Sequence, residues 1–262
     1  MWKNINFENC LSYIAGYSDT EGYVKNENCF EASPHRPGQA DFEEKIHPAA
    51  RPSISISRMC GAGGRTVASE LMEYLQLHTS ADRRWTIFDK NLIEKVLEDH
   101  RLSKKIAEFM PESHKSRLAE MLEQMRGLHP PVSTIINQTV ETVWNLATGG
   151  YVILVGRAAN VITEKLANVY HVRLVGALEN RIARIEAVYE LGRTDAREFI
   201  QRQDAAKRRY MRDYFGREID DPMLYHMIIN TDKISYGNAA RLIGDAVINR
   251  FKLAASPKLT TG

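Results

Sequence analysis

The chain has 262 residues, of which 44% are hydrophobic and 26% charged, and this composition is ordinary for a globular protein with a full hydrophobic core. Its formal net charge of +2 is too close to neutral to favour nucleic acid or a membrane as a bulk partner. The sequence has neither an apolar run of membrane-spanning length nor the basic and then apolar start of a signal peptide, so we expect a cytoplasmic protein. Its three cysteines lack metal-binding spacing and fit a reducing compartment.

Residues 1–50 differ in composition from the rest of the chain. They contain eight acidic and four basic residues and the turn-rich stretch SPHRPGQ. We interpret this segment as a flexible appendage that is dispensable for chemistry and can serve a protein partner. We expect the domain proper to cover residues 51–252 and residues 253–262 to form a tail.

The stretch Ser53–Glu70, SISISRMCGAGGRTVASE, predicts a strand, a glycine-rich turn and the start of a helix. Serine and isoleucine alternate in its first half, and β-branched residues favour a strand. Gly61, Gly63 and Gly64 allow positive φ and a close approach of the backbone to a ligand. Apolar residues recur with helical spacing from Val67 onward. This order of elements can hold phosphate, because backbone N–H groups and the helix dipole favour an anion.

The loop departs from the phosphate-loop pattern GxxxxGK[ST]. When its GAG segment is aligned on that pattern, Arg58 stands at the first glycine and Gly64 at the lysine, with Arg65 and Thr66 following. Arg65 or Arg58 can supply the missing cation, because a guanidinium binds phosphate well. We favour Arg65. The alternative is a glycine-rich turn that has no ligand.

Short apolar runs alternate with helical segments in the rest of the chain. We expect strands at 85–88, 151–155, 169–175 and 227–230, and helices at 91–97, 98–131, 132–147, 179–189 and 238–251. This alternation predicts an α/β fold, a parallel sheet of about five strands with helices on both faces. Ligands of such sheets bind at the carboxyl ends of the strands. Asp89 and Arg157 come at the ends of two predicted strands, so we expect both beside the glycine loop.

Asp89 and Arg157 also have structural alternatives. Asp89 can cap a following helix, and this role is compatible with facing a ligand. Arg157 ends a buried strand, where either a ligand phosphate or a helix carboxylate can neutralise its charge.

Residues 193–217 carry eight basic and four acidic residues. Asp204 and Arg208 stand four residues apart and can pair on a helix. The excess of positive charge predicts a basic helical lid that is mobile alone and closes over polyphosphate. A solvated helix face is the structural alternative. Nucleic-acid binding lacks support because no aromatic residues are interleaved for base stacking, and the histidines show no metal-binding spacing.

Together these features resemble the cytidylate kinase-like family of P-loop nucleoside monophosphate kinases. The matching pieces, over about residues 52–250, are ISISRMCGAGGRTVASEL, FDKNLIEKV, YVILVGRAANVI, the region from Asp204 to Tyr210, and MIINTDKISYGNAARLI. The resemblance implies a P-loop kinase-type fold and transfer of the γ-phosphoryl group of ATP to CMP or dCMP, with Mg²⁺. The alternatives are a kinase for another small acceptor and a catalytically weak nucleotide-binding module.

The resemblance also implies roles for individual residues. The residues expected to bind the ATP phosphates are Gly61, Ala62, Gly63, Gly64, Arg65 and Thr66, of which Thr66 would face Mg²⁺. Those expected to face the acceptor are Asp89, Arg157, Asn160 and Arg181. Those expected to stabilise the transferring phosphoryl group, which needs positive charge and in-line placement, are Arg58, Arg65, Lys207 and Arg208. The missing lysine is a departure from the family pattern, as is Val155 where a strand-end acid could hold Mg²⁺.

Overall fold

The computed structural model of the chain describes residues 51–80, 84–89 and 133–254. The appendage predicted at 1–50 and the helices predicted at 91–97 and 98–131 lie outside these residues, as does most of the predicted tail. Within the described ranges, no helix combines the length and the apolar character that crossing a bilayer requires.

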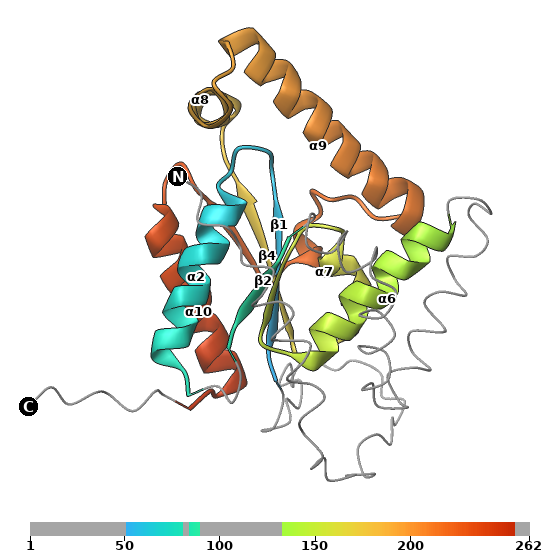
Figure 1. Cartoon of the computed structure of the whole chain (residues 1–262), viewed down its shortest axis with the longest axis vertical. Coiled ribbons are helices and arrows are strands. Elements are labelled where there is room, and N and C mark those ends of the chain that lie inside the picture. The colour runs from blue at the N-terminus through green and yellow to red at the C-terminus, as the bar shows by residue number, and fades with distance from the viewer. Residues whose placement is uncertain (1–50, 81–83, 90–132, 255–262) are drawn as a thin grey trace, which may run out of the picture.

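Five parallel strands form the sheet at the centre of the molecule (Figure 1). They are β1 (Ser53–Arg58), β2 (Thr86–Phe88), β3 (Val152–Val155), β4 (Val169–Val175) and β5 (Met227–Asn230). Their order is β2-β3-β1-β4-β5, and every pair of neighbours is parallel. The predicted α/β fold is therefore confirmed. From β1 the chain runs to β2 and β3 on one side of it, and from β3 it crosses over to β4 on the other side of β1. The end of β1 is therefore the topological switch point, where such sheets bind ligands.

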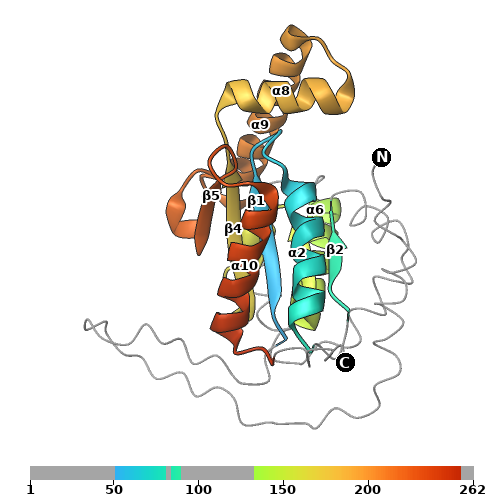
Figure 2. The ribbon, with the colours of Figure 1, turned by 90° about the vertical axis from the view of Figure 1, so that its left-hand side faces the viewer.

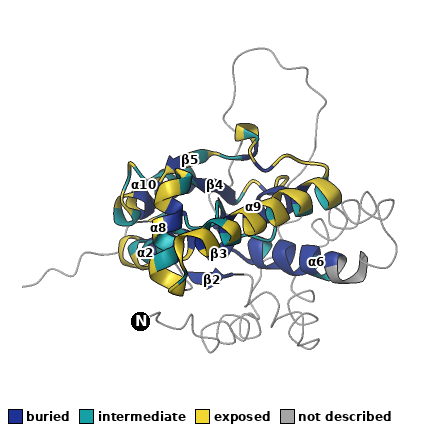
Figure 3. Cartoon of the chain, turned by 90° about the horizontal axis from the view of Figure 1, so that it is seen from above, coloured by how far each residue is buried: buried dark blue, intermediate teal, exposed yellow. Residues whose placement is uncertain are grey.

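Helices cover both faces of the sheet. Figures 1 and 2 show α2 (Gly64–His78) and α10 (Tyr236–Phe251) side by side on one face, and α6 (Ser133–Gly149) with the short α7 (Ala159–Ile162) on the other. Beyond the carboxyl edge of the sheet lie α8 (Leu178–Tyr189) and α9 (Arg193–Phe215), and a 3₁₀ turn, Pro222–Leu224, leads into β5. Seen from above, α6 is largely buried where its side chains are described, whereas α9 has one long exposed side (Figure 3).

The central strands bury side chains on both faces, as the continuous apolar run of β3 predicts. Val152 and Leu154 pack in the cluster beneath α6, whereas Ile153 and Val155 pack against α2 and α10. In β1 the isoleucines join the α2 and α10 side, and the serines fill the opposite face. Those serines are buried and hydrogen-bonded, since Ser53 Oγ donates to the Ala147 carbonyl at 2.8 Å. The core thus fixes β1, and with it the loop that follows.

Two leucines of α2 allow this burial to be tested. Leu71 is 0% exposed and Leu77 is 72% exposed. We expect Leu71→Ala to lower the free energy of unfolding by about 3 kcal/mol, because it removes buried contacts and leaves a cavity. The control Leu77→Ala should change it by less than about 0.5 kcal/mol. Urea denaturation measures both values, and equal effects would contradict the assigned orientation of α2.

Candidate functional site

The loop between β1 and α2 has the geometry of the predicted glycine-rich turn. Gly61 and Gly63 both have a φ of +79°, a conformation that favours glycine. Other residues also pack closely against the loop. A Cβ added to Gly61 would lie 2.8 Å from the Arg181 carbonyl oxygen, and a Cβ added to Gly63 would lie 2.2 Å from Cε1 of Tyr236. Gly63 is the N-cap of α2 and has no side chain to accept from the first turn of the helix. The N–H groups that open α2 are therefore available to a ligand.

Beside this loop, Asp89 follows β2 and is buried. Arg65, in the first turn of α2, places Nη2 2.6 Å from Asp89 Oδ2 and keeps its side chain 47% exposed. A residue predicted to bind ATP phosphates and one predicted to face the acceptor thus form an ion pair with each other. The alternative role of Asp89 as a helix cap concerns residues outside the described ranges.

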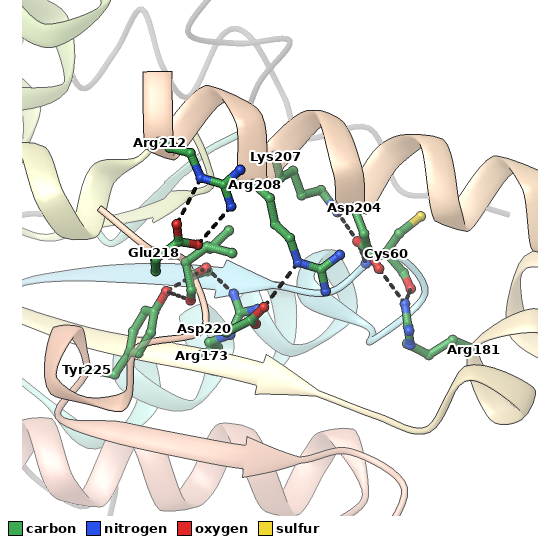
Figure 4. Close-up of polar contacts among 12 residues, drawn as sticks. Cys60, Arg173, Arg181, Asp204, Lys207, Arg208, Arg212, Glu218, Asp220 and Tyr225 are labelled. Atoms are coloured by element: carbon green, nitrogen blue, oxygen red, sulfur yellow. Dashed lines mark hydrogen bonds and ion pairs between the residues drawn. The ribbon is translucent and has the colours of Figure 1, made fainter. Parts of the chain in front are cut away.

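The carboxylate of Asp204 joins α9 to the same loop (Figure 4). The Cys60 N–H donates to Oδ1 at 2.7 Å, and Arg181 Nη1 donates to Oδ2 at 2.6 Å. Lys207 Nζ donates to Oδ1 at 3.1 Å. The predicted pair between Asp204 and Arg208 is wrong, because Asp204 points inward to the loop. Arg208 instead pairs with Asp220, at 3.1 Å.

Two arginines of α8 hold the loop from its other side. Arg181 is buried and donates to the carbonyls of Cys60 and Gly176, at 3.0 and 2.9 Å, in addition to Asp204. Arg184 donates to the Gly61 carbonyl at 3.3 Å and pairs with Asp232 at 2.9 Å. The contacts of Arg184 were not predicted, and no local sequence pattern links it to the loop. The acceptor-binding role of Arg181 stays a prediction, since the contacts described for it are to the protein.

The carboxyl end of β3 brings two further predicted residues to this edge. Gly156 and Arg157 have φ of +89° and +54°, so the chain turns sharply after the strand. Asn160, in α7, is 4% exposed, and its Nδ2 has no hydrogen-bond acceptor among the described residues. A buried donor without a partner costs about 1–3 kcal/mol, and a ligand atom could satisfy it.

More of the basic residues of 193–217 form ion pairs than the sequence predicts. Six of the eight form ion pairs with carboxylates, and these are Arg193, Arg197, Lys207, Arg208, Arg212 and Arg217. Their partners are Glu179, Asp204, Asp220, Glu218 and Glu164. Most of these acids come from outside 193–217, so the excess of positive charge within the segment is largely neutralised by other segments. Arg202 and Arg209 have no ion pair within the described part of the chain, and both are exposed.

The remaining predicted cation, Arg58, lies at the centre of the site. Its side chain crosses Gly64 and ends against Gly156, since a Cβ added to Gly156 would be 2.3 Å from Arg58 Nη1. Lys207 Nζ lies 3.4 Å from the Arg58 carbonyl oxygen. Burial lowers the pKa of Lys207, and the positive charge of Arg58 lowers it further. The described residues around the loop thus include six basic side chains and three carboxylates, and these are Arg58, Arg65, Arg157, Arg181, Arg184 and Lys207, with Asp89, Asp204 and Asp232.

The same residues limit the chemistry of the site. Burial raises the pKa of the Cys60 thiol, which disfavours a thiolate nucleophile. In the ranges described, no group of three or more histidine, cysteine, aspartate or glutamate residues could hold a metal ion. The arrangement is suited to binding an anion and stabilising negative charge.

Asp204 offers a test of how α9 is held. Asp204→Asn should lower the free energy of unfolding by about 3 kcal/mol, because it leaves two partly buried cations without their carboxylate. Asp213→Asn is the matched control on the same helix, as Asp213 is exposed, and should change stability by less than about 0.5 kcal/mol. Chemical denaturation compares the two. Similar midpoints for both variants would show that Asp204 does not anchor the helix.

Comparison with known proteins gives a family for this site. The model of the cytidylate kinase-like family matches residues 53–233. No curated protein matches the chain. Among solved structures, an uncharacterized protein from Eubacterium ventriosum is 20% identical, with a TM-score of 0.59 over 76% of this chain and 99% of that one. Shikimate kinase from Acinetobacter baumannii, in complex with shikimate, is 13% identical, with a TM-score of 0.40 over 76% of this chain and 94% of that one. Because the family model covers more than half of the sequence, the glycine loop and its surrounding cations included, the chain belongs to the cytidylate kinase-like family.

Proposed function

We propose that this protein transfers the γ-phosphoryl group of ATP to a nucleoside monophosphate, CMP or dCMP. The observation that carries the proposal is the glycine loop with an open helix N-terminus, surrounded by more cations than carboxylates at the carboxyl edge of the sheet. Backbone N–H groups and guanidinium groups are the donors that phosphates prefer. The family match supports a kinase-type enzyme that binds nucleotides.

The reaction requires placement and charge rather than a protein nucleophile. The acceptor phosphate oxygen attacks the γ-phosphorus in line with the departing ADP, and negative charge spreads over the transferred group. The loop from Gly61 to Thr66 would hold the phosphates of ATP. Cations fixed by ion pairs to the protein, such as Lys207, need no reorganisation as the charge develops.

Mg²⁺ would enter this site together with ATP. The described residues offer no carboxylate cluster for it, and Mg²⁺ commonly keeps its waters and binds substrate phosphates with few protein ligands. We assign Thr66, in the first turn of α2, as the residue whose hydroxyl would face Mg²⁺. Its chemistry would be to neutralise phosphate charge.

The acceptor would lie between the ends of β2 and β3. Asp89, Arg157 and Asn160 are brought to that edge by the sheet, and Asn160 has a buried donor to satisfy. An arginine there suits a phosphate, and an amide suits a base or ribose. The rival is a nucleotide-binding module with little turnover, which the replacement of the P-loop lysine favours.

A panel of acceptors tests the proposed reaction. We expect ADP release coupled to CMP and dCMP to give kcat/KM at least about tenfold above UMP, AMP or shikimate, because a site built to hydrogen-bond one base rejects others. Gly63→Val sets the background, since its side chain would overlap Tyr236 at the loop. Preference for a non-nucleotide acceptor would replace the proposal with another kinase, and turnover no higher than Gly63→Val would favour the binding module.

We also propose that α9 is a lid that ion pairs hold against the site. In the structure α9 lies against the loop through Asp204 and Lys207, and these two contacts join its middle to the site. Polyphosphate in the loop would give Lys207 a second anion to bind. Bound nucleotide should therefore hold this helix more firmly.

Hydrogen exchange measures the lid directly. ATP should slow exchange across 193–215 more than in β3, which is buried in either state. Lys207→Ala should remove most of that added protection. Arg209→Ala is the matched control, because Arg209 is a base of the same helix that faces solvent. A helix whose exchange does not respond to ATP would be static, and the lid assignment would be wrong.

A further inference from the structure

Two positions of the phosphate loop are exchanged in this chain. The pattern GxxxxGK[ST] has glycine first and lysine six residues later. Here the first position is Arg58, and six residues later stands Gly64. The chain therefore has a long cation where the pattern has no side chain, and no side chain where the pattern has a long cation.

The structure shows why the two changes belong together. A Cβ on Gly64 would lie 2.8 Å from Arg58 Cγ and 3.1 Å from its Cδ. Non-bonded carbons do not approach so closely, since the optimal separation is about 3.5–4.0 Å. Side chains at 58 and 64 would therefore start in the same space. With Arg58 in this conformation, position 64 has room only for glycine, and a larger residue at 64 would displace the Arg58 side chain.

The far end of Arg58 reaches the carboxyl end of the neighbouring strand. A Cβ on Gly156, directly after β3, would be 2.3 Å from Nη1 and 3.0 Å from Cζ. The guanidinium thus lies on bare backbone between the ends of β1 and β3. The φ of +89° favours glycine at 156, and a Cβ there would also push the guanidinium out of this position. This position lies at the topological switch point, where sheets of this topology bind ligands.

Arg58 also differs from its neighbours in charge pairing. Arg65 pairs with Asp89, and Arg181 and Lys207 share Asp204. The guanidinium of Arg58 has no hydrogen bond or ion pair among the described residues, although the side chain is partly buried. Burial lowers the pKa of Arg58, yet an arginine keeps its charge in proteins. A buried charge without a partner is costly, and a bound anion would remove that cost.

We propose that Arg58 is the catalytic replacement of the P-loop lysine, and that Gly64 and Gly156 leave the space through which its side chain passes. The inference rests on the proposed function, since it assigns the cation that binds the β- and γ-phosphates. A bond forms between the acceptor phosphate oxygen and the γ-phosphorus, and the bond from the γ-phosphorus to the bridging oxygen breaks. The electron pair leaves with ADP. Arg58 stays protonated throughout and supplies charge, whereas Arg65, which the sequence favoured for this role, is paired with Asp89.

Removing the charge of Arg58 tests its role. Arg58→Met keeps an unbranched stem over Gly64. We expect its Kd for ATP and for inorganic tripolyphosphate, by calorimetry, to rise at least about tenfold, and any turnover to fall about 100-fold or more. Arg209→Ala, an exposed arginine of α9, should bind both as the wild type does. Unchanged binding by folded Arg58→Met, or no binding of either probe by the wild type, would overturn the inference.

Exchanging the two positions tests the replacement itself. Gly64→Lys alone should bind tripolyphosphate poorly, because its side chain overlaps Arg58. Arg58→Gly combined with Gly64→Lys recreates the phosphate-loop pattern and should restore binding to within about fivefold of the wild type. A folded double variant that binds no better than Gly64→Lys would overturn the inference, and this comparison holds even if Arg58→Met does not fold.

Phosphorylation of an acceptor and tripolyphosphate binding are separate outcomes, so the proposed function and this inference can fail independently. If tripolyphosphate binding depends on Arg58 but no acceptor is phosphorylated, the proposed function fails and Arg58 stands as the phosphate-binding cation. If an acceptor is phosphorylated equally well without Arg58, the proposed function stands and this inference fails.

Discussion

The arrangement of the site depends on one carboxylate, that of Asp204. It accepts hydrogen bonds from a loop N–H, from Arg181 of α8 and from Lys207 of its own helix. Three segments distant in sequence are therefore fixed against one another at a single point. Both Arg181 and Asp204 keep side chains only about a tenth exposed, so each charge relies on the other for the solvation it has lost. Without this carboxylate the loop would remain, but the helices that surround it would have no common anchor.

The net positive charge at the carboxyl edge of the sheet depends on which bases the nearby carboxylates pair with. Asp89 is engaged by Arg65, and Asp204 is shared by two bases. Neither carboxylate forms an ion pair with Arg58. Positive charge consequently remains where β1 and β3 end, beside N–H groups that point the same way. A site with this balance attracts anions such as phosphate, as expected of a kinase-type enzyme that binds nucleotides.

The sequence predicts those features that depend on neighbouring residues. The apolar run of β3, the helical spacing after Val67 and the glycines of the loop are local patterns, and the structure confirms each of them. Ion pairs between residues distant in the sequence could not be predicted from local patterns. Arg208 was expected to pair four residues away with Asp204, but its carboxylate is Asp220, which follows the end of α9. The overlap of Arg58 with Gly64 likewise required coordinates, because a sequence pattern records which residue occupies a position and not the path of its side chain.

The polar face of β1 takes part in holding the second half of α9. Arg173, 4% exposed in β4, donates to Ser57 Oγ at 2.9 Å and pairs with Asp220. Asp220 also binds Arg208, so a buried arginine of the sheet holds the second half of α9 (Figure 4). Met211 adds burial in the cluster beneath α6. The first half packs with α8 in a small cluster that Cys60 of the loop also joins, and it contacts the loop and the end of β1 through Asp204 and Lys207. α9 is therefore held by two polar contacts, one of Asp204 at the loop and one of Asp220 beside the sheet, and a lid movement of the kind proposed above would have to break the contacts of Asp204.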